Sequence, residues 1–265
     1  MKIIRFKDSQ GITRVGTDPE DGRAIEVSQT GHGDWIPTGR AMEIKQYLPP
    51  VKPAALFCIG LNYRQHAEET GMELPPYPIL FMKNPAAAAG HGRDIVLPES
   101  CRKKAQADFE AELAVVMGRE AKNVSAAEAL SYVKGYTIGN DVSARWWQKH
   151  AGGGQWVRAK SFDTFCPLGP ALVTADEIQD PGNLAISCSV NGKTMQESST
   201  SDMIFSVARL IEYLSEDTTL LPDTVILTGT PSGVGVARKP PVFLNPGDRI
   251  EISIEKIGTL ANKVA

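Results

Sequence analysis

Two carboxylates one residue apart are the groups in this sequence best placed to do chemistry. Glu110 and Glu112 lie in QADFEAELAVVMG, where the apolar run 113–117 follows them and Gly118 ends it. Such a run is typical of a buried strand, and residues i and i+2 of a strand project from the same face. Two carboxylates at one end of a core strand are costly to bury unless a cation compensates their charge. A hard divalent metal ion, which prefers oxygen ligands, is the simplest such cation.

Two further segments place charged groups at the ends of apolar stretches. Asp141 directly follows the strand-like GYTIGN, and Lys160 lies in WVRAKSFDTFCPLGP. Three carboxylates suit Mg²⁺ or Mn²⁺ better than zinc, which prefers thiolate and imidazole ligands. They would leave one negative charge on a dication, which Lys160 could balance. The spacing alone leaves a solvated strand face open as the alternative, and Asp108 could support this group or lie on the surface.

A histidine and a glutamate form a second candidate pair, in CIGLNYRQHAEETG. His66 and Glu69 are three residues apart, so on a helix they share a face. A carboxylate beside an imidazole orients the ring and stabilises its protonated form, as a general base requires. Gly60 and Gly71 bracket the segment and could let it move as a lid. An ordinary solvated helix face is the alternative.

The elements that must position these groups are mostly strands. Residues 1–50 show a weak strand pattern broken by turn-forming sequences such as DSQG, TDPEDG and TGHGDW, and YLPPVKP resembles a linker. From residue 54 onward, apolar runs of strand length follow one another, with helices expected at 125–130 and 201–215. Many strands and few helices indicate a β-rich α+β fold rather than a doubly wound sheet. The runs that we expect to form strands are ALFCIG, PILFMK, IVLP, LAVVMG, KGYTIGND, PALVT, LAISCSVNGK, TVILTG and DRIEISIE.

Composition excludes several classes of function. Of 265 residues, 42% are hydrophobic and 22% charged, and the net charge of −3 comes without a basic block. We therefore expect a sizeable core and neither a nucleic-acid surface nor a membrane partner, because no run approaches the roughly 20 apolar residues of a membrane span. The N-terminal segment MKIIRFKDSQG lacks the apolar stretch of a signal peptide. Four scattered cysteines (Cys58, Cys101, Cys166 and Cys188) indicate reduced thiols, and hence a cytoplasmic protein.

Five motifs in order carry a family resemblance: GLNYRQHAEE, DFEAELAVVMG, GYTIGNDVSAR, RAKSFDTFCPLGP and LTGTPSGVG. Together they resemble the fumarylacetoacetate hydrolase superfamily, over residues 57–264, and the segment before them is similar to the small N-terminal domain of many bacterial members. The resemblance implies a mixed β-sheet roll with few flanking helices, usually a homodimer. We expect a small β-rich domain at residues 1–50 and a catalytic domain at 54–265.

The resemblance also implies roles for individual residues. The metal ligands would be Glu110, Glu112 and Asp141, and the catalytic residues would be His66 and Glu69, as a mobile general-base dyad, with Lys160 stabilising an enolate or oxyanion. Substrate would contact Arg145, Gln148 and Thr230. Family members often place a lysine at the position of Lys83, whose role stays open, and residues 150–155 (HAGGGQ) would form a loop near the site rather than a phosphate loop.

The expected activity is that of an Mg²⁺- or Mn²⁺-dependent enzyme acting on a small anionic 2-oxo acid that can enolise. The first expectation is hydrolysis of a C–C bond in an acylpyruvate or fumarylpyruvate, with the pyruvate fragment leaving as a metal-bound enolate. The alternative is an oxaloacetate tautomerase or decarboxylase that uses the same residues. These motifs do not separate the two branches.

Overall fold

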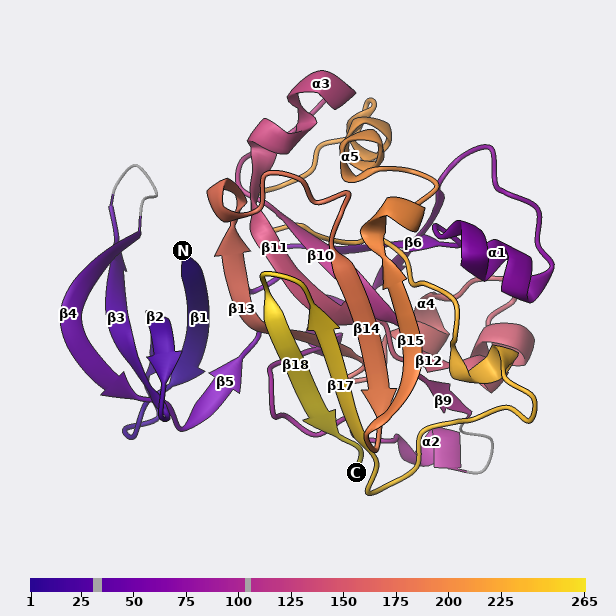
Figure 1. Ribbon diagram of the computed structural model, residues 1–265, viewed down its shortest axis with the longest axis horizontal. Helices are drawn as coiled ribbons and strands as arrows, with labels where there is room; N and C mark the ends of the chain where they lie inside the picture. The colour runs from indigo at the N-terminus through magenta and orange to yellow at the C-terminus, as the bar shows by residue number, and fades with distance from the viewer. Residues whose placement is uncertain (31–34, 103–105) are drawn as a thin grey trace.

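The computed structural model describes residues 1–30, 35–102 and 106–265 and shows a β-rich α+β fold. Two sheets pack together with a few helices around them, and the N-terminal strands extend to one side (Figure 1). The expected mixed-sheet architecture is confirmed.

A twelve-stranded mixed sheet is the larger of the two. Its strands are β1 (Lys2–Lys7), β2 (Thr13–Glu20), β3 (Arg23–Gln29), β4 (Trp35–Glu43), β5 (Gln46–Leu48), β6 (Leu56–Gly60), β7 (Ile79–Lys83), β8 (Ala88–Ala89), β10 (Ala111–Met117), β11 (Val133–Asn140), β13 (Cys166–Thr174) and β16 (Val225–Leu227). The main path runs β4-β3-β2-β1-β13-β11-β10-β16-β6-β7, with β5 beside β1 and β8 beside β13. Neighbours are antiparallel except at β16–β6 and β13–β8.

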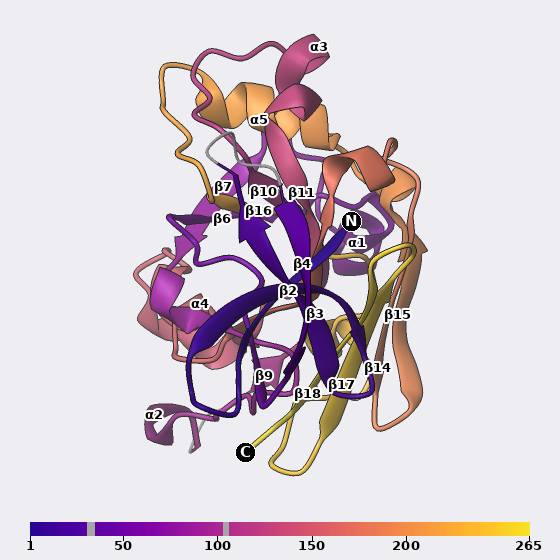
Figure 2. The ribbon, with the colours of Figure 1, turned by 90° about the vertical axis from the view of Figure 1, so that its left-hand side faces the viewer.

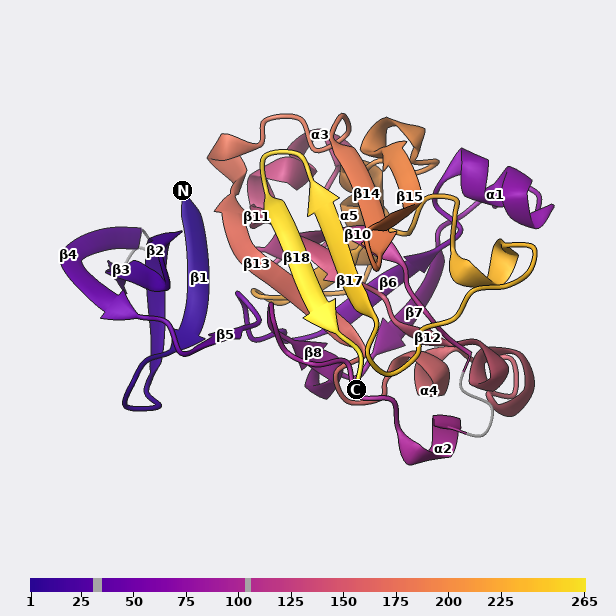
Figure 3. The same ribbon diagram turned by 60° about the horizontal axis from the view of Figure 1, so that its bottom comes forward.

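An antiparallel four-stranded sheet covers one face of this large sheet (Figure 3). It comprises β14 (Ala185–Val190), β15 (Lys193–Ser199), β17 (Arg249–Ile254) and β18 (Gly258–Lys263), in the order β15-β14-β17-β18. A two-stranded ladder joins β9 (Ala107–Asp108) to β12 (Ser143–Ala144). This short ladder brings the segment before Glu110 alongside the segment after Asp141.

Strand β10 is buried on both faces, which explains its unbroken apolar sequence. Leu113 and Val115 join the core shared with the four-stranded sheet, whereas Ala114 and Val116 join the core on the opposite face. Because side chains alternate along a strand, Glu112 belongs to the second of these faces. The strand period therefore sets where the acidic group lies.

The helices are short, and one begins later than expected. A helix was expected from residue 201, but it starts at Val207, where the Ser206 hydroxyl accepts a hydrogen bond from the amide of Arg209. Asn62 holds the residues before it, since its side-chain oxygen accepts from the Phe205 amide and its carbonyl accepts from the Ile204 amide. The α-helices are α1 (Arg64–Thr70), α2 (Glu99–Arg102), α3 (Ala126–Ala129), α4 (Val157–Lys160) and α5 (Val207–Ser215).

Two other expected elements differ in detail. The helix expected at 125–130 is the single turn of α3 followed by a 3₁₀ turn at Leu130–Tyr132, and Ser125 donates its hydroxyl to the Glu128 carboxylate, 2.9 Å away, instead of capping an amide. The run 95–98 is not a strand. It lies beside the C-terminus through a single bridge between Ile95 and Val264.

The N-terminal strands β1 to β4 continue the large sheet, and Figure 2 shows them facing the viewer. β1 reaches β13 through only two residue pairs, Lys2 with Val173 and Ile3 with Leu172. At the β1–β2 turn, the Asp8 carboxylate accepts from two backbone amides and from Arg14. The expected division between residues 1–50 and 54–265 stays a prediction, and the turn expected at TGHGDW lies mostly outside the described residues.

Candidate active site

The carboxylates of Glu110, Glu112 and Asp141 meet at one edge of the large sheet. β10 and β11 are antiparallel, with Ala111 opposite Asn140, so the residue before β10 and the residue after β11 share that edge. Each of the three residues offers a carboxylate oxygen, and these oxygens lie within 4.8 Å of one another. The three residues are only 6%, 2% and 0% exposed. Buried oxygen donors at this separation fit a hard divalent cation.

Two buried lysines neutralise part of this negative charge. The ammonium of Lys160 donates to Glu110 Oε2 at 2.7 Å, Asp141 Oδ2 at 2.6 Å and Ser143 Oγ at 2.7 Å, so all three of its protons have acceptors. Lys83, whose role the sequence left open, donates to Asp141 Oδ1 at 2.5 Å. Asp141 is thus held between two ammonium groups.

Arg145 connects the acidic group to its surroundings through all three nitrogens of its guanidinium group. It donates to Glu110 Oε1 at 2.6 Å, to Gln148 Oε1 at 3.0 Å and to Asp108 Oδ2 at 2.9 Å. Asp108 is fully buried rather than on the surface. Sequence reasoning left its role open, because its partners Gly235 and Val236 lie far along the chain.

The electrostatics separate the two glutamates. Burial opposes ionisation of Glu110, but the charges of Lys160 and Arg145 outweigh burial and hold its pKa below the usual range. Burial, together with the charges of Asp141 and Glu110, raises the pKa of Glu112 well above its ordinary value. For Lys160 and Arg145, burial is outweighed by neighbouring carboxylates, so the pKa of each is raised. Of the two glutamates, Glu112 is therefore the one whose raised pKa favours the neutral form.

The loop after β16 packs onto the acidic group and supplies Thr230. The amide of Gly229 donates to Glu112 Oε2 at 2.7 Å. Thr230 is 5% exposed, and its hydroxyl oxygen accepts from Gln196 Nε2 at 2.8 Å, while Gln196 Oε1 accepts from the amide of Ala111 at 3.0 Å. Gln196 thus links this loop to Ala111, the residue between the two glutamates. No sequence motif identified Gln196, because it lies in the four-stranded sheet and its partner Ala111 lies in the large sheet.

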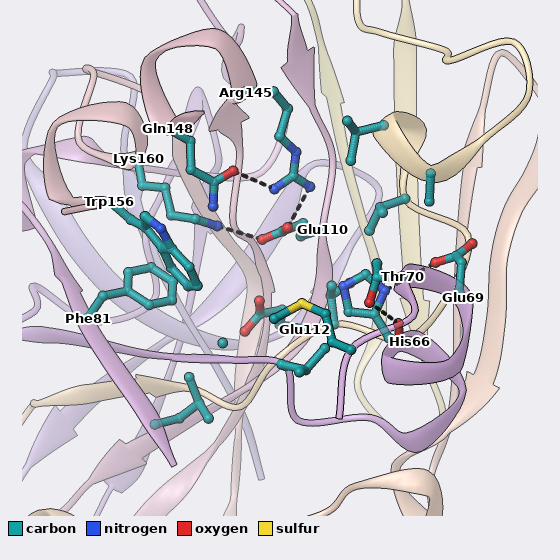
Figure 4. Close-up of a pocket in the computed structure, with 18 of the residues that line it drawn as sticks. His66, Glu69, Thr70, Phe81, Glu110, Glu112, Arg145, Gln148, Trp156 and Lys160 are labelled. Atoms are coloured by element: carbon teal, nitrogen blue, oxygen red, sulfur yellow. Dashed lines mark hydrogen bonds and ion pairs between the residues drawn. The ribbon is translucent and has the colours of Figure 1, made fainter. Parts of the chain in front are cut away.

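His66 and Glu69 lie on α1, on the opposite side of the cavity from Glu110 and Lys160 (Figure 4). His66 Nδ1 is 3.1 Å from Glu69 Oε2, and the two side chains keep 12% and 24% of their exposure. The amide of Gly233 donates to both oxygens of Glu69, at 2.9 and 3.1 Å. Gly71 ends α1 in the left-handed conformation with φ 66°. The pairing of the dyad matches the sequence expectation, and its movement as a lid stays a prediction.

One cavity of about 520 Å³ collects these groups. Eight of the nine expected site residues line it, and the ninth, Asp141, reaches it through its contact with Lys160. Its other walls are largely apolar. They include Ile59, Met72, Phe81, Trp156, Val234 and Val236.

Neighbouring segments behave largely as expected. Burial raises the pKa of Cys166 to about 12, which argues against a nucleophilic thiol. The HAGGGQ segment begins in the π-helical turn Trp147–Ala151 and continues into a turn with Gly153 and Gly154 at φ 56° and 85°. Gln148 and Lys149 on this π-helical turn line the cavity. The segment is therefore a loop beside the site.

Comparison with known proteins identifies the family. A family model described as fumarylacetoacetate (FAA) hydrolase, C-terminal, matches residues 55–265. The chain belongs to the fumarylacetoacetate hydrolase family. It is a family enzyme, and the match covers all nine expected site residues.

Individual relatives carry different activities in their names. "Oxaloacetate tautomerase FAHD2A, mitochondrial" from Bos taurus is 44% identical over 246 residues, covering 92% of this chain and 77% of that protein. The structure of 5-carboxymethyl-2-hydroxymuconate delta-isomerase from Mycobacterium smegmatis matches with TM-score 0.85 at 38% identity, covering 100% of this chain and 99% of the other. Fumarylacetoacetate hydrolase from Exiguobacterium antarcticum matches with TM-score 0.85 at 34% identity and the same coverages. The family thus includes both isomerases and hydrolases.

Within the described residues, no helix is long and apolar enough to cross a membrane. The bovine relative is named as mitochondrial. The cytoplasmic location, the homodimer and the absence of a nucleic-acid partner stay predictions for this chain.

Proposed function

We propose that this enzyme interconverts the keto and enol forms of a short 2-oxo dicarboxylic acid of the oxaloacetate class. The observation that carries the proposal is the facing arrangement of a histidine–glutamate pair and a buried acidic triad across one cavity. The names of the bovine tautomerase and the mycobacterial delta-isomerase support isomerisation ahead of hydrolysis. This reverses the order in which the sequence alone ranked the two.

Glu110, Glu112 and Asp141 would hold the divalent ion, with Mg²⁺ or Mn²⁺ favoured by an all-oxygen donor set. When bound, the ion supplies Lewis acidity to the 2-oxo group and fixes the adjacent carboxylate. The charges fit an anionic substrate. Four buried carboxylates, including Asp108, face Lys83, Lys160 and Arg145, so a dication leaves the cluster with one net positive charge.

The proton transfers belong to His66. The Nδ1–H group of His66 donates a hydrogen bond to the Glu69 carboxylate. This leaves Nε2 as the basic nitrogen that removes a proton from C3 of the keto acid. The electron pair of the broken C3–H bond forms the C2–C3 double bond, and the C2=O pair moves onto oxygen. The charge of Lys160 favours this developing negative charge. Return of the proton from the imidazolium to that oxygen completes the enol.

Hydrolysis of an acylpyruvate is the second candidate, and the size and apolar walls of the cavity support it. Its volume of about 520 Å³ lies within the roughly 300–1,000 Å³ typical of sites for much larger ligands than a four-carbon acid. The apolar walls formed by Met72, Phe81 and Trp156 would suit an acyl tail. In that reaction His66 would activate water instead of removing a C3 proton.

The test measures which products form. Enol-oxaloacetate is added to purified enzyme with MgCl₂, enol absorbance is followed, and malate dehydrogenase with NADH reports the keto form while lactate dehydrogenase reports pyruvate in a parallel assay. We expect faster ketonisation than with MgCl₂ alone, without pyruvate. Pyruvate release from oxaloacetate would indicate decarboxylation. Acetylpyruvate is tested in the same way. If the enzyme releases pyruvate from acetylpyruvate and does not ketonise enol-oxaloacetate faster than MgCl₂ alone, hydrolysis replaces this proposal.

A further inference from the structure

Asp108 has no role in the chemistry proposed above, yet its carboxylate is one of the most fully bonded in the site. It is 0% exposed. Its Oδ1 accepts from the amides of Phe109 and Gly235 at 2.9 and 2.7 Å, and its Oδ2 accepts from the amide of Val236 at 3.0 Å and Arg145 Nε at 2.9 Å. A buried charge with four donors holds its surroundings in one arrangement, because any of these donors left unpaired costs free energy.

Two of the three backbone amides bound by Asp108, those of Gly235 and Val236, belong to the loop 229–237, which also contacts both sides of the cavity. At one end Gly229 donates to Glu112, and in the middle Gly233 donates to both oxygens of Glu69. The loop is tightly seated. A Cβ at Gly233, which has φ +100°, would lie 2.1 Å from the Met195 carbonyl oxygen, and one at Gly235 would lie 2.6 Å from Asp108 Oδ1.

Asp108 therefore has two connections into the site. One runs through Arg145 to Glu110, whose Oε1 lies 2.6 Å from Nη2. The other runs through the loop amides of Gly235 and Val236, and then Gly233, to Glu69 and the imidazole that it orients.

We propose that Asp108 is a positioning residue that locks the loop 229–237 and thereby fixes the His66–Glu69 pair relative to the acidic triad. The proposal rests on the proposed function in that turnover through His66 is one of its readouts. Asp108 touches neither substrate nor base. It sets the geometry from which the base acts, and a displacement of about 1 Å at a reacting group can cost a hundredfold in rate.

The chain contains a matched control. Asp8 is also buried, and its carboxylate accepts from two backbone amides, of Gln10 and Ile12, and from Arg14 Nε, each at 2.9 Å. It closes a turn in the N-terminal strands and lines no part of the active-site cavity. Asp8→Asn and Asp108→Asn therefore remove the same kind of network from two different places.

The experiment compares these variants by turnover and by amide exchange. In Asp108→Asn we expect kcat to fall by about 10–100-fold, as is typical when a supporting contact of a site is lost, while the Kd for Mn²⁺ changes by less than about tenfold. Deuterium exchange in peptides covering 229–237 should accelerate. Asp8→Asn should change neither kcat nor exchange in those peptides. Should Asp108→Asn not fold, Asp108→Glu, which keeps the charge but lengthens the side chain, takes its place.

A double-mutant cycle decides whether Asp108 acts through the base. In a His66→Ala background, Asp108→Asn should lower the remaining turnover by less than about threefold, because the group that it positions is gone. An undiminished effect in that background, equal losses in Asp8→Asn, or unchanged exchange at 229–237 would each overturn the proposal. If the wild-type enzyme enolises no 2-oxo acid, the proposed function fails, whereas the exchange measurement still decides whether Asp108 locks the loop.

Discussion

The two sides of the cavity are built very differently. The floor comprises Glu110, Glu112, Asp141, Lys83 and Lys160. Its carboxylates lie at the ends of the central strands β10 and β11, whereas Lys83 ends β7 and Lys160 ends α4. The side chains of Lys160 and Asp141 are 2% and 0% exposed. The rim, comprising His66 and Glu69, lies on a seven-residue helix with side chains that keep 12% and 24% exposure. Floor residues hold one another through short charged contacts, whereas the rim is joined to the loop 229–237 mainly through one amide, that of Gly233.

Under the proposed function, the two sides have different roles: the floor would stabilise negative charge on the substrate, and the rim would transfer protons. The floor is buried and highly charged, so under the proposed function it would favour negative charge that develops on a 2-oxo oxygen. Under the proposed function the rim would decide where a proton is removed or a water is activated, and its side chains are more exposed than those of the floor. The delta-isomerase and the hydrolase with this fold carry different activities in their names, although both match this chain over its whole length. We infer that such differences originate at the rim and the adjoining cavity walls.

The largest effect should come from the floor. Glu112→Gln keeps an acceptor for the Gly229 amide and resembles the neutral form that the raised pKa of Glu112 favours, so the fold should be retained. Turnover should fall on the order of a thousandfold, because Lewis-acid stabilisation is worth several kcal/mol and each 1.4 kcal/mol is tenfold. Thermal unfolding with and without MnCl₂ checks the cause: the metal-induced rise in Tm should disappear. A variant that keeps both that rise and its turnover would remove Glu112 from the metal site.

A variant of the rim, His66→Ala, should separate proton transfer from metal binding. His66→Ala should lower kcat by about a hundredfold or more, as expected for the loss of a general base, with Mn²⁺ affinity unchanged. Calorimetric titration of Mn²⁺ into the variant, beside steady-state kinetics, makes the comparison. Wild-type turnover in His66→Ala would mean that the proton moves through another group.

A smaller effect is expected where the loop meets the floor. Gln196→Met removes the acceptor of the Ala111 amide and the donor to Thr230, so it should destabilise the protein by about 1–3 kcal/mol through buried groups left unpaired. Because Gln196 touches neither the rim nor a carboxylate, kcat should fall less than about tenfold. Urea denaturation and kinetics on the same preparation measure both. If Gln196→Met lost as much turnover as His66→Ala, the proposed difference between the roles of floor and rim would be wrong.

The smallest effect on activity belongs to the N-terminal strands. The hydrogen bond from Arg14 lowers the pKa of Asp8, so this carboxylate stabilises the fold above its unfolded pKa of about 4, and the stabilisation disappears as pH falls through the lower folded pKa. Asp8→Asn should lower Tm at pH 7, and its difference from wild type should shrink below about pH 4. Melting curves across pH test this, with kcat at neutral pH expected to stay at the wild-type value.

Local patterns predicted most of the elements and singled out the Glu110–Glu112 and His66–Glu69 pairs, because these depend on short stretches of sequence, whereas Arg145, Gln148 and Thr230 were expected only from the family resemblance. The apolar run after Glu112 specifies a buried strand, and the spacing of His66 and Glu69 specifies a shared helix face. Long-range contacts were not predictable in this way. Asp108 bonds to amides 127 and 128 residues away, and Gln196 joins Ala111 across 85 residues.

The late start of α5 has the same origin. Helical periodicity continues back to residue 201, but Asn62 binds the backbone at 204 and 205 and Tyr63 forms a bridge with Met203. These tertiary contacts hold the segment extended, so the helix begins only where Ser206 can cap it.

Proton exchange at C3 of a 2-oxo acid tests the central claim most directly. Oxaloacetate is incubated briefly in D₂O with MgCl₂ and enzyme, and loss of the C3 proton signal is followed by NMR. The floor and rim together predict rapid exchange with the wild-type enzyme, and exchange at the rate of MgCl₂ alone with either Glu112→Gln or His66→Ala. Exchange by His66→Ala at the wild-type rate, or no exchange by a wild-type enzyme that still consumes enol-oxaloacetate, would contradict the account.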